Sequence, residues 1–366
     1  MMAAIDTYLT VMTQISASDL HLSSGVRPTY RVHGVMRATS SEKTQPVPDE
    51  EIRRMLREIM PDRNRLEFEK RKDTDFAYEI AGVGRFRVNV FNDRNGVGAV
   101  FRHIPENVLG FEQLGLSQVF ADLCLLNKGL VLVTGPTGSG KSTTLAAMID
   151  YINENRTDHV VTIEDPIEFV HVNKRCLINQ REVYRHTEGF KAALRAALRQ
   201  DPDVVLVGEM RDLETTETAI ETAETGHLVF GTLHTSSAAG TIDRVIDQFP
   251  VDRQDQIRMM LSASLKGVIS QTLLKRADGG GRVAAFEILV VTSAVANQIR
   301  EGKTHQIPMA MQTGARLGMR SLSDDLIRLV KEGKVEPLEA YRKSIDKSDM
   351  ENRLRVAGFG LQISGR

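Results

Sequence analysis

The chain has 366 residues, of which 41% are hydrophobic and 26% charged, a composition that excludes disordered, collagen-like and low-complexity classes. Because single hydrophobic cores stop growing at roughly 250 to 300 residues, we expect two domains. The 47 Lys and Arg residues against 48 Asp and Glu leave a net charge of −1, which provides no overall field to attract nucleic acid or an anionic membrane.

Cysteine usage and hydropathy give no sign of a metal framework or a membrane span. Cys124 and Cys176 lie far apart, with no Cys or His beside them at ligand spacing, so we interpret both as buried thiols. The N-terminus lacks a basic segment followed by a long apolar stretch, and no run approaches the roughly 20 apolar residues of a spanning helix. We therefore expect a cytoplasmic protein.

Residues 1–103 predict a small α+β domain. Short strand-like runs accompany one helical stretch, Asp49–Met60, which a proline ends. The most regular strand, Arg85–Phe91, is followed by hairpin-turn residues at 92–96 and by a return strand, Val97–Arg102. A period of two places three apolar side chains of the first strand on one face: Phe86, Val88 and Val90.

Residues 104–115 are interpreted as a linker, because Pro105, Gly110 and Gly115 stand there among mixed polar residues. The second predicted domain, residues 116–366, has a different pattern. Aliphatic runs alternate with helical stretches, which predicts a largely parallel sheet with helices on both faces. The runs are Leu130–Val133, Val160–Ile163, Val204–Val207 and Leu228–Leu233.

After about Pro250 the pattern becomes mainly helical. One further strand is predicted there, at Val283–Val290. The helices that fit best are Asp252–Ser270, Ser293–Glu301 and Ser321–Lys331.

A glycine-rich segment follows the first aliphatic run and reads Gly135-Pro136-Thr137-Gly138-Ser139-Gly140-Lys141-Ser142. In this G-x-x-x-x-G-K-S pattern the glycines let backbone N–H groups curl around phosphate oxygens, and the next helix directs its positive end at them. Lys141 is expected to neutralise the β and γ phosphates, and Ser142 to bind magnesium. A strand before the motif and a helix after it favour this interpretation over a chance glycine-rich turn, so we predict a site for ATP and Mg²⁺.

Two acidic residues are candidates for the hydrolysis chemistry, which requires one carboxylate to orient water and another to hold the metal. Glu164 follows the aliphatic run 159–163, and Glu209 follows residues 203–208. Each therefore stands where a buried strand leaves the sheet. The alternative, that either acid only caps the next helix, stays open at this point.

Two histidines, His227 and His234, stand at opposite ends of one predicted strand. At about 3.3 Å per residue they are roughly 23 Å apart and cannot share a metal ion. A lone histidine is more often structural than functional. His234, at the exit of the strand, is the better candidate for sensing a γ phosphate or a neighbouring subunit.

Arginines gather in two places. Taken singly, each is better explained as solvated surface, but an arginine presented to a phosphate by another domain or subunit is a recurring way to stabilise transition-state charge. On the hairpin of the first domain they are Arg85, Arg87, Arg94 and Arg102, and near Glu209 they are Arg195, Arg199 and Arg211.

Four segments together resemble the secretion and type IV pilus ATPase superfamily, most closely its twitching-motility PilT family. The similarity extends from about Ser18 to about residue 345, and four boxes in this order are far more specific than the first alone. They are Gly135–Thr143 (Walker A), Thr162–His171 (Asp box), Asp201–Asp212 (Walker B) and Thr225–Thr235 (His box).

The resemblance implies a homohexameric ring with ATP bound at the junctions between subunits. Each subunit would be α/β, with a smaller N-terminal α+β PAS-like domain before a C-terminal RecA-like motor domain. The motor would depolymerise the type IV pilus at the cytoplasmic face of the inner membrane, held there by an inner-membrane platform protein, and nucleic acid is not expected as a partner.

By motif, the resemblance implies that Glu164 is the catalytic glutamate and Glu209 the Walker B acid that acts on magnesium. It implies that Gly135–Thr143 and His227 bind the nucleotide, with His234 as the second His-box residue. The hairpin arginines of the family correspond to two residues of the first domain, Arg94 and Arg102.

The C-terminal motif of the retraction family reads Ala-Ile-Arg-Asn-Leu-Ile-Arg-Glu. Ala294–Glu301 keeps five of its eight positions, and Ala296 replaces its first arginine. The two cysteines cannot form the four-cysteine zinc site of the extension ATPases. The resemblance thus implies a retraction motor, with an accessory retraction ATPase or a related secretion motor as the alternative. A nucleic-acid motor and a non-catalytic ATP-binding scaffold are the other hypotheses.

Overall fold

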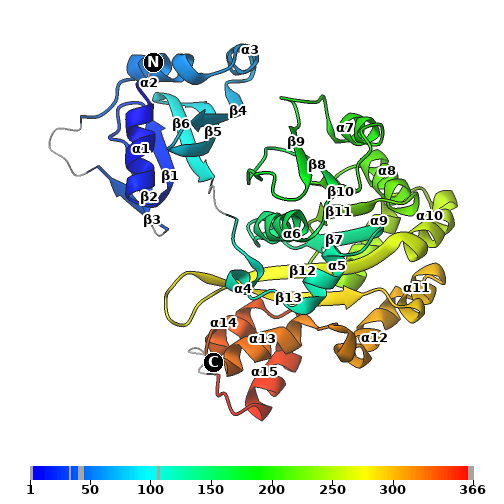
Figure 1. The fold of residues 1–366 in the computed structure, drawn as a ribbon. Helices are drawn as coiled ribbons and strands as arrows, with labels where there is room; N and C mark the ends of the chain where they lie inside the picture. Colours follow the sequence, from blue (N-terminus) through cyan, green and yellow to red (C-terminus); the bar gives the residue numbers. More distant parts are fainter. Residues whose placement is uncertain (1–2, 33, 40–44, 105–107, 362–366) are drawn as a thin grey trace. The chain divides into compact units, whose positions relative to one another are not determined.

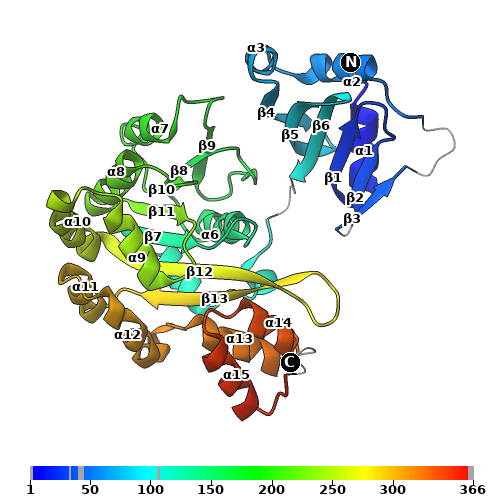
Figure 2. The ribbon, with the colours of Figure 1, turned by 180° about the vertical axis from the view of Figure 1, so that it is seen from behind.

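The computed structural model describes residues 3–32, 34–39, 45–104 and 108–361. The chain divides into two compact units, residues 1–107 and 108–366 (Figures 1 and 2). Their boundary falls within the predicted linker, of which residues 105–107 lie outside the described residues. Ile104 ends a strand, and a short helix occupies Phe111–Leu114.

The N-terminal unit contains an antiparallel sheet of six strands among the residues described, in the order β3-β2-β1-β6-β5-β4. Its elements are α1 (Asp6–Gln14), β1 (Ala17–Ser23), β2 (Thr29–Val32), β3 (Val35–Ala38), α2 (Asp49–Ile59), α3 (Asp62–Arg71), β4 (Asp73–Ile80), β5 (Gly84–Asp93) and β6 (Gly96–Ile104).

The period-two strand predicted in this unit is confirmed as β5. Phe86, Val88 and Val90 are each 0% exposed and pack with α1 and α2 in one core. The arginines that alternate with them are half-buried on the other face. Strand β6 returns beside β5 as the hairpin pattern predicts.

The C-terminal unit is built on a seven-stranded sheet within the described ranges, in the order β13-β12-β7-β11-β10-β8-β9, and only the β12–β13 pair is antiparallel. The elements up to β11 are α4 (Phe111–Leu114), α5 (Gln118–Cys124), β7 (Gly129–Thr134), α6 (Lys141–Asn155), β8 (His159–Glu164), β9 (Leu177–Glu182), α7 (Phe190–Ala197), β10 (Val204–Val207), α8 (Leu213–Glu224) and β11 (Leu228–Leu233).

The remaining elements combine the β12–β13 hairpin with helices. They are α9 (Ala238–Asp247), α10 (Val251–Ser264), β12 (Leu265–Lys275), β13 (Arg282–Val290), α11 (Ser293–Arg300), η1 (Thr304–Gln306), α12 (Ile307–Thr313), η2 (Ala315–Leu317), α13 (Leu322–Lys331), α14 (Pro337–Lys343) and α15 (Lys347–Val356).

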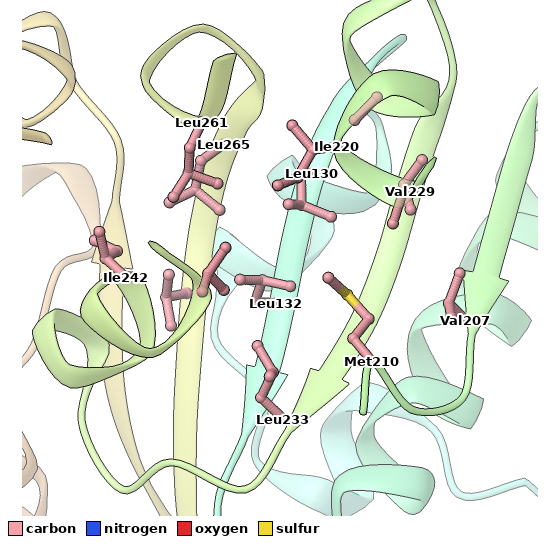
Figure 3. Packing of buried hydrophobic residues seen from close by; sticks show 14 of the residues in the cluster. Leu130, Leu132, Val207, Met210, Ile220, Val229, Leu233, Ile242, Leu261 and Leu265 are labelled. Carbon is pink, nitrogen blue, oxygen red and sulfur yellow. The ribbon is translucent and has the colours of Figure 1, made fainter. Parts of the chain in front are cut away.

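Both faces of this sheet are covered, because successive side chains of a strand point to opposite sides. In β7, Leu130 and Leu132 pack with helices α7 to α11 (Figure 3). Val131 and Val133 pack with α5 and α6 in a second core. The predicted parallel sheet with helices on both faces is confirmed. Cys124 and Cys176 are buried free thiols, as predicted.

One helix prediction was wrong at its end. The stretch Asp252–Ser270 is helical only to Ser264, and the chain then continues as strand β12. A short apolar run does not distinguish a buried strand from a helix by periodicity. Here pairing with β7 on one side and β13 on the other makes residues 265–275 a strand.

Three C-terminal helices, α13 to α15, form a separate small core against the β12–β13 hairpin. Leu274 of β12 and Ala285 of β13 are 0% exposed within it. Asp325 of α13 accepts a hydrogen bond from the Phe286 backbone at 2.8 Å, which fixes these helices to β13. In the described part of the chain, no helix has the length and apolarity that crossing a bilayer requires.

Candidate active site

Four parallel strands bring most of the predicted site residues to one edge of the C-terminal sheet. Strands β7, β11, β10 and β8 are consecutive neighbours that run in one direction. Because the carboxyl ends of parallel strands meet at the same edge, the residues that follow them lie in a row. That row holds the phosphate loop, residues 135–140, after β7, His234 after β11, Glu209 after β10, and Glu164 at the end of β8.

The phosphate loop has the backbone conformation that its glycines predict. The φ angles are 143° at Gly135, 76° at Gly138 and 90° at Gly140. Residues other than glycine rarely adopt these positive φ values. Helix α6 begins at Lys141, directly after the loop. Of the other motif residues, Pro136 and Thr137 are exposed. Two lie half-buried in the first turn of α6, namely Ser142 and Thr143.

Lys141 folds back over the loop. Its Nζ donates to the carbonyl oxygen of Gly135 at 2.8 Å and lies 3.3 Å from that of Pro136. Burial lowers the pKa of the Lys141 ammonium, while the charges of Glu209 and Glu168 act to raise it. The ammonium is thus held against the carbonyl oxygens of the phosphate loop.

His234 connects Lys141 with Glu209. Its Nδ1 lies 3.4 Å from Lys141 Nζ, and its Nε2 lies 3.0 Å from Glu209 Oε1. An ammonium only donates and a carboxylate only accepts, so the tautomer with the proton on Nε2 satisfies both contacts. The sheet order explains this bridge, since β11 lies between β7 and β10.

Glu209 lies beside Arg211 and His234. Arg211 Nε lies 2.6 Å from its Oε1. Partial burial acts to raise the pKa of Glu209, but the hydrogen bond and charge of Arg211, together with His234, bring the pKa below its ordinary value. This carboxylate is thus held ionised, as a metal ligand must be.

Glu164 has neutral neighbours instead. Its Oε1 accepts a hydrogen bond from Thr162 Oγ1 at 2.6 Å and one from Gln180 Nε2 at 3.1 Å. Desolvation raises the pKa of Glu164 to about 7, while these hydrogen bonds act to lower it. A carboxylate with a pKa near neutrality is suited to accept a proton from water.

The structure does not bring His227 to the phosphate loop. It precedes β11, at the end of the strand opposite to His234, and its Nδ1 lies 3.1 Å from the carbonyl oxygen of Thr222. The length of β11 separates His227 from the phosphate loop of the same chain, and its action on a nucleotide stays a prediction. His227 closes the turn between α8 and β11.

The two hairpin arginines belong to the N-terminal unit. Arg94 is exposed in the turn between β5 and β6. The side chain of Arg102 is 67% exposed, and its Nε lies 2.9 Å from Asp19 Oδ1. Their action on a nucleotide stays a prediction.

Several residues that sequence reasoning did not single out complete the site. Thr162 precedes Glu164 by two positions in the strand, a spacing that places both on one face and could have indicated the contact. A Cβ at Gly208 would lie 3.2 Å from the Glu164 Cα, so this glycine permits the close packing of β10 and β8. No sequence feature indicated that Gln180 on β9 or Gln271 on β12 belongs to the site, because neither strand was predicted.

The chain is similar to known proteins over nearly its whole length. A family model described as Type II/IV secretion system protein matches residues 1–342. The type IV pilus retraction ATPase PilT of Pseudomonas aeruginosa is 56% identical over 90% of this chain and 94% of its own length. A twitching motility protein of Neisseria gonorrhoeae is 49% identical over 93% of this chain and 92% of its own length.

A solved structure shows the same fold. The crystal structure of the pilus retraction motor PilT with bound ADP matches with a TM-score of 0.89 and 44% identity, over 96% of this chain and 100% of that one. The predicted fold class, a RecA-like P-loop motor domain preceded by a smaller α+β domain, is thereby confirmed. The likeness of the smaller domain to PAS domains stays a prediction. Since the family model and these relatives span nearly all of it, the chain belongs to the type II/IV secretion system protein family.

Proposed function

We propose that this chain is an ATPase that converts ATP hydrolysis into conformational change and thereby drives type IV pilus retraction. The observation that carries the proposal is the row of Lys141, His234, Glu209 and Glu164 along one sheet edge, beside a glycine-rich loop that opens a helix. The 56% identity to a retraction ATPase supports the choice of pilus retraction as the output.

Hydrolysis on this geometry begins when phosphates enter the loop and meet its backbone N–H groups and the positive end of α6. Lys141 then exchanges the carbonyl oxygens of Gly135 and Pro136 for phosphate oxygens. Glu164 accepts the proton of the attacking water, because its raised pKa leaves it basic enough near neutral pH. His234 contacts both Lys141 and Glu209, so displacement of Lys141 alters the surroundings of Glu209.

The residues present fit Mg²⁺ as a cofactor. The hydroxyl of Ser142 and the ionised carboxylate of Glu209 are oxygen ligands, which Mg²⁺ prefers, and this ion is usually bound by one or two protein groups together with substrate phosphates. When bound, it would neutralise charge on the β and γ phosphates. The described residues contain no group of three or more His, Cys, Asp or Glu able to hold a metal, so we expect the ion to bind with the nucleotide.

We further propose that the chain works as a homohexamer, with Arg94 and Arg102 supplied to a nucleotide across a subunit boundary. Arginine is suited to this because its planar fork binds phosphate oxygens in pairs. An inner-membrane platform protein would hold the ring at the cytoplasmic face of the membrane. An accessory retraction ATPase is the second candidate, which Ala296 in place of the family arginine favours.

Deletion of the gene in its host tests the proposal. We expect excess surface pili and loss of twitching, restored by the wild-type gene and by a Glu188→Gln control, whose side chain is exposed. The Glu164→Ala gene should not restore twitching. Cells without pili would contradict retraction and indicate extension. Restored twitching by this chain in a host that lacks its own principal retraction ATPase would exclude the accessory role.

A further inference from the structure

Strand β12 lies directly beside the strand that leads into the phosphate loop. Ser270 of β12 is in register with Thr134, the last residue of β7. Their hydroxyl oxygens are 2.7 Å apart and both residues are buried. The next residue on β12, Gln271, therefore lies alongside Gly135 and the loop, and its side chain is only 3% exposed.

Gln271 contacts the loop through both its side chain and its backbone. Its Nε2 donates to the carbonyl oxygen of Ser139 at 2.6 Å. A Cβ at Gly135 would lie 2.3 Å from the Gln271 carbonyl oxygen, and a Cβ at Gly140 would lie 3.1 Å from Gln271 Nε2. Gly135 and Gly140 therefore leave room for Gln271, in addition to adopting positive φ angles.

The hydrogen bond to Ser139 determines the direction of the following N–H. In a trans peptide the carbonyl of one residue and the N–H of the next point in opposite directions. Because Gln271 holds the Ser139 carbonyl toward β12, the Gly140 N–H is directed away from β12 and toward the space that the loop encloses. Phosphate oxygens bind to N–H groups directed in this way.

Two polar atoms at this contact have no partner. Gln271 Oε1 and Ser139 Oγ are both buried and without a hydrogen bond in the structure. A buried amide oxygen left unpaired is costly. Gln271 thus has one paired and one unpaired polar atom at the loop.

Hydroxyl contacts hold the part of β12 next to Gln271 in place. Thr241 of α9 lies with its Oγ1 3.4 Å from Thr134 Oγ1 and 2.6 Å from Thr235 Oγ1. These hydroxyl contacts connect the ends of β7 and β12 with the segment that carries His234. Gln271 consequently approaches the loop from a rigid strand.

We propose that Gln271 is a positioning residue for nucleotide binding, acting through the Ser139–Gly140 peptide. The proposal rests on the proposed ATP site, so ATP binding by the wild-type chain is measured first. If the wild-type chain does not bind ATP, the proposed function fails, whereas the tests below concern Gln271 alone.

The first test replaces Gln271 with methionine, which has similar length and cannot donate to the Ser139 carbonyl. We expect the Kd and KM for ATP of Gln271→Met to rise roughly tenfold, the size typical of one lost hydrogen bond to a fixed group, while kcat changes by less than about threefold. Thr272→Val, on the same strand, is the control and should keep wild-type values. A Gln271→Met chain with wild-type Kd would overturn the proposal.

A second variant distinguishes a loss of ATP affinity caused by the missing hydrogen bond from one caused by a destabilised fold. In Gln271→Glu the ionised carboxylate cannot donate to Ser139, but the protonated acid can. We expect its Kd for ATP to approach the wild-type value as pH falls from 8 to 6, whereas the ratio of the Gln271→Met to the wild-type Kd should not change with pH. Loss of binding that follows a lowered melting temperature in both variants, with no recovery at low pH, would overturn the proposal.

Discussion

The ends of strands β8 and β10 present the same residue type at the same edge of one sheet, yet they give it opposite properties. Glu164 accepts hydrogen bonds from the neutral groups of Thr162 and Gln180, and desolvation raises its pKa to about 7. Glu209 is paired with Arg211 and His234, and its pKa is lowered. The difference arises from the neighbours, since both acids follow a short aliphatic strand.

This difference is the reason for which we propose separate roles for the two acids. A proton acceptor must bind a proton near the working pH, and a metal ligand must stay ionised. Removal of either acid, or of a neighbour that shifts its pKa, tests these separate roles.

The largest effect is expected from Glu164→Gln, which keeps the shape of the side chain and removes its basicity. Loss of a general base lowers turnover by about 10² to 10⁴-fold, and ATP binding should persist because the phosphate loop is unchanged. Steady-state hydrolysis and equilibrium ATP binding measure the two quantities. Turnover within threefold of the Glu188→Gln control would show that Glu164 is not the base.

The next largest effect is expected from Glu209→Gln. The amide cannot form an ion pair with Arg211 and is a poor ligand for Mg²⁺, so the Mg²⁺ concentration that gives half-maximal hydrolysis should rise about tenfold or more. A titration of hydrolysis with Mg²⁺ at fixed ATP measures this. If Glu164→Gln changed the half-maximal Mg²⁺ concentration instead, the roles of the two acids would be reversed.

A smaller effect concerns pH. The ionised form of Glu164 is the active base, so kcat of the wild-type chain should rise with pH through about 7. Gln180→Leu removes a hydrogen bond that lowers the pKa of Glu164, and its kcat profile should therefore move to higher pH, by up to about one unit. Profiles at saturating ATP test this, and a shift to lower pH would contradict the account.

The smallest effect is expected from Arg211→Met. Removal of Arg211 lets the pKa of Glu209 rise toward its ordinary value, but a carboxylate of ordinary pKa is still ionised at pH 7. We expect kcat at pH 7 to change by less than about threefold, with a greater loss below pH 5.5 as Glu209 becomes protonated. A large loss at pH 7 would indicate that Arg211 itself contacts the phosphates.

The sequence predicted where the two acids stand but could not predict how they differ. Glu164 and Glu209 were identified because each follows an aliphatic run, and parallel strands bring such positions to one edge. The basicity of Glu164 depends on Gln180, whose strand β9 was not predicted, and on desolvation by packing. His234 was the favoured histidine because it follows the strand, whereas the role of His227 was implied only by the family resemblance.

The same limit explains the strand that was taken for the end of a helix. Residues 265–275 have no local pattern that opposes a helix strongly enough, and their pairing with β7 and β13 is a tertiary effect. Gln271 was missed with that strand. Motif residues close together in the sequence were therefore found, and residues that support the motif from distant strands were not.

Strand β12 carries Gln271 at the phosphate loop and, three residues later, Leu274 in the core of the C-terminal helices. Three residues of extended strand span only about 10 Å, and β13 pairs with β12 along this part, whereas the pairing with β7 ends at Ser270. The phosphate loop and the core of helices α13 to α15 are therefore joined by three residues of one strand, with no turn between them.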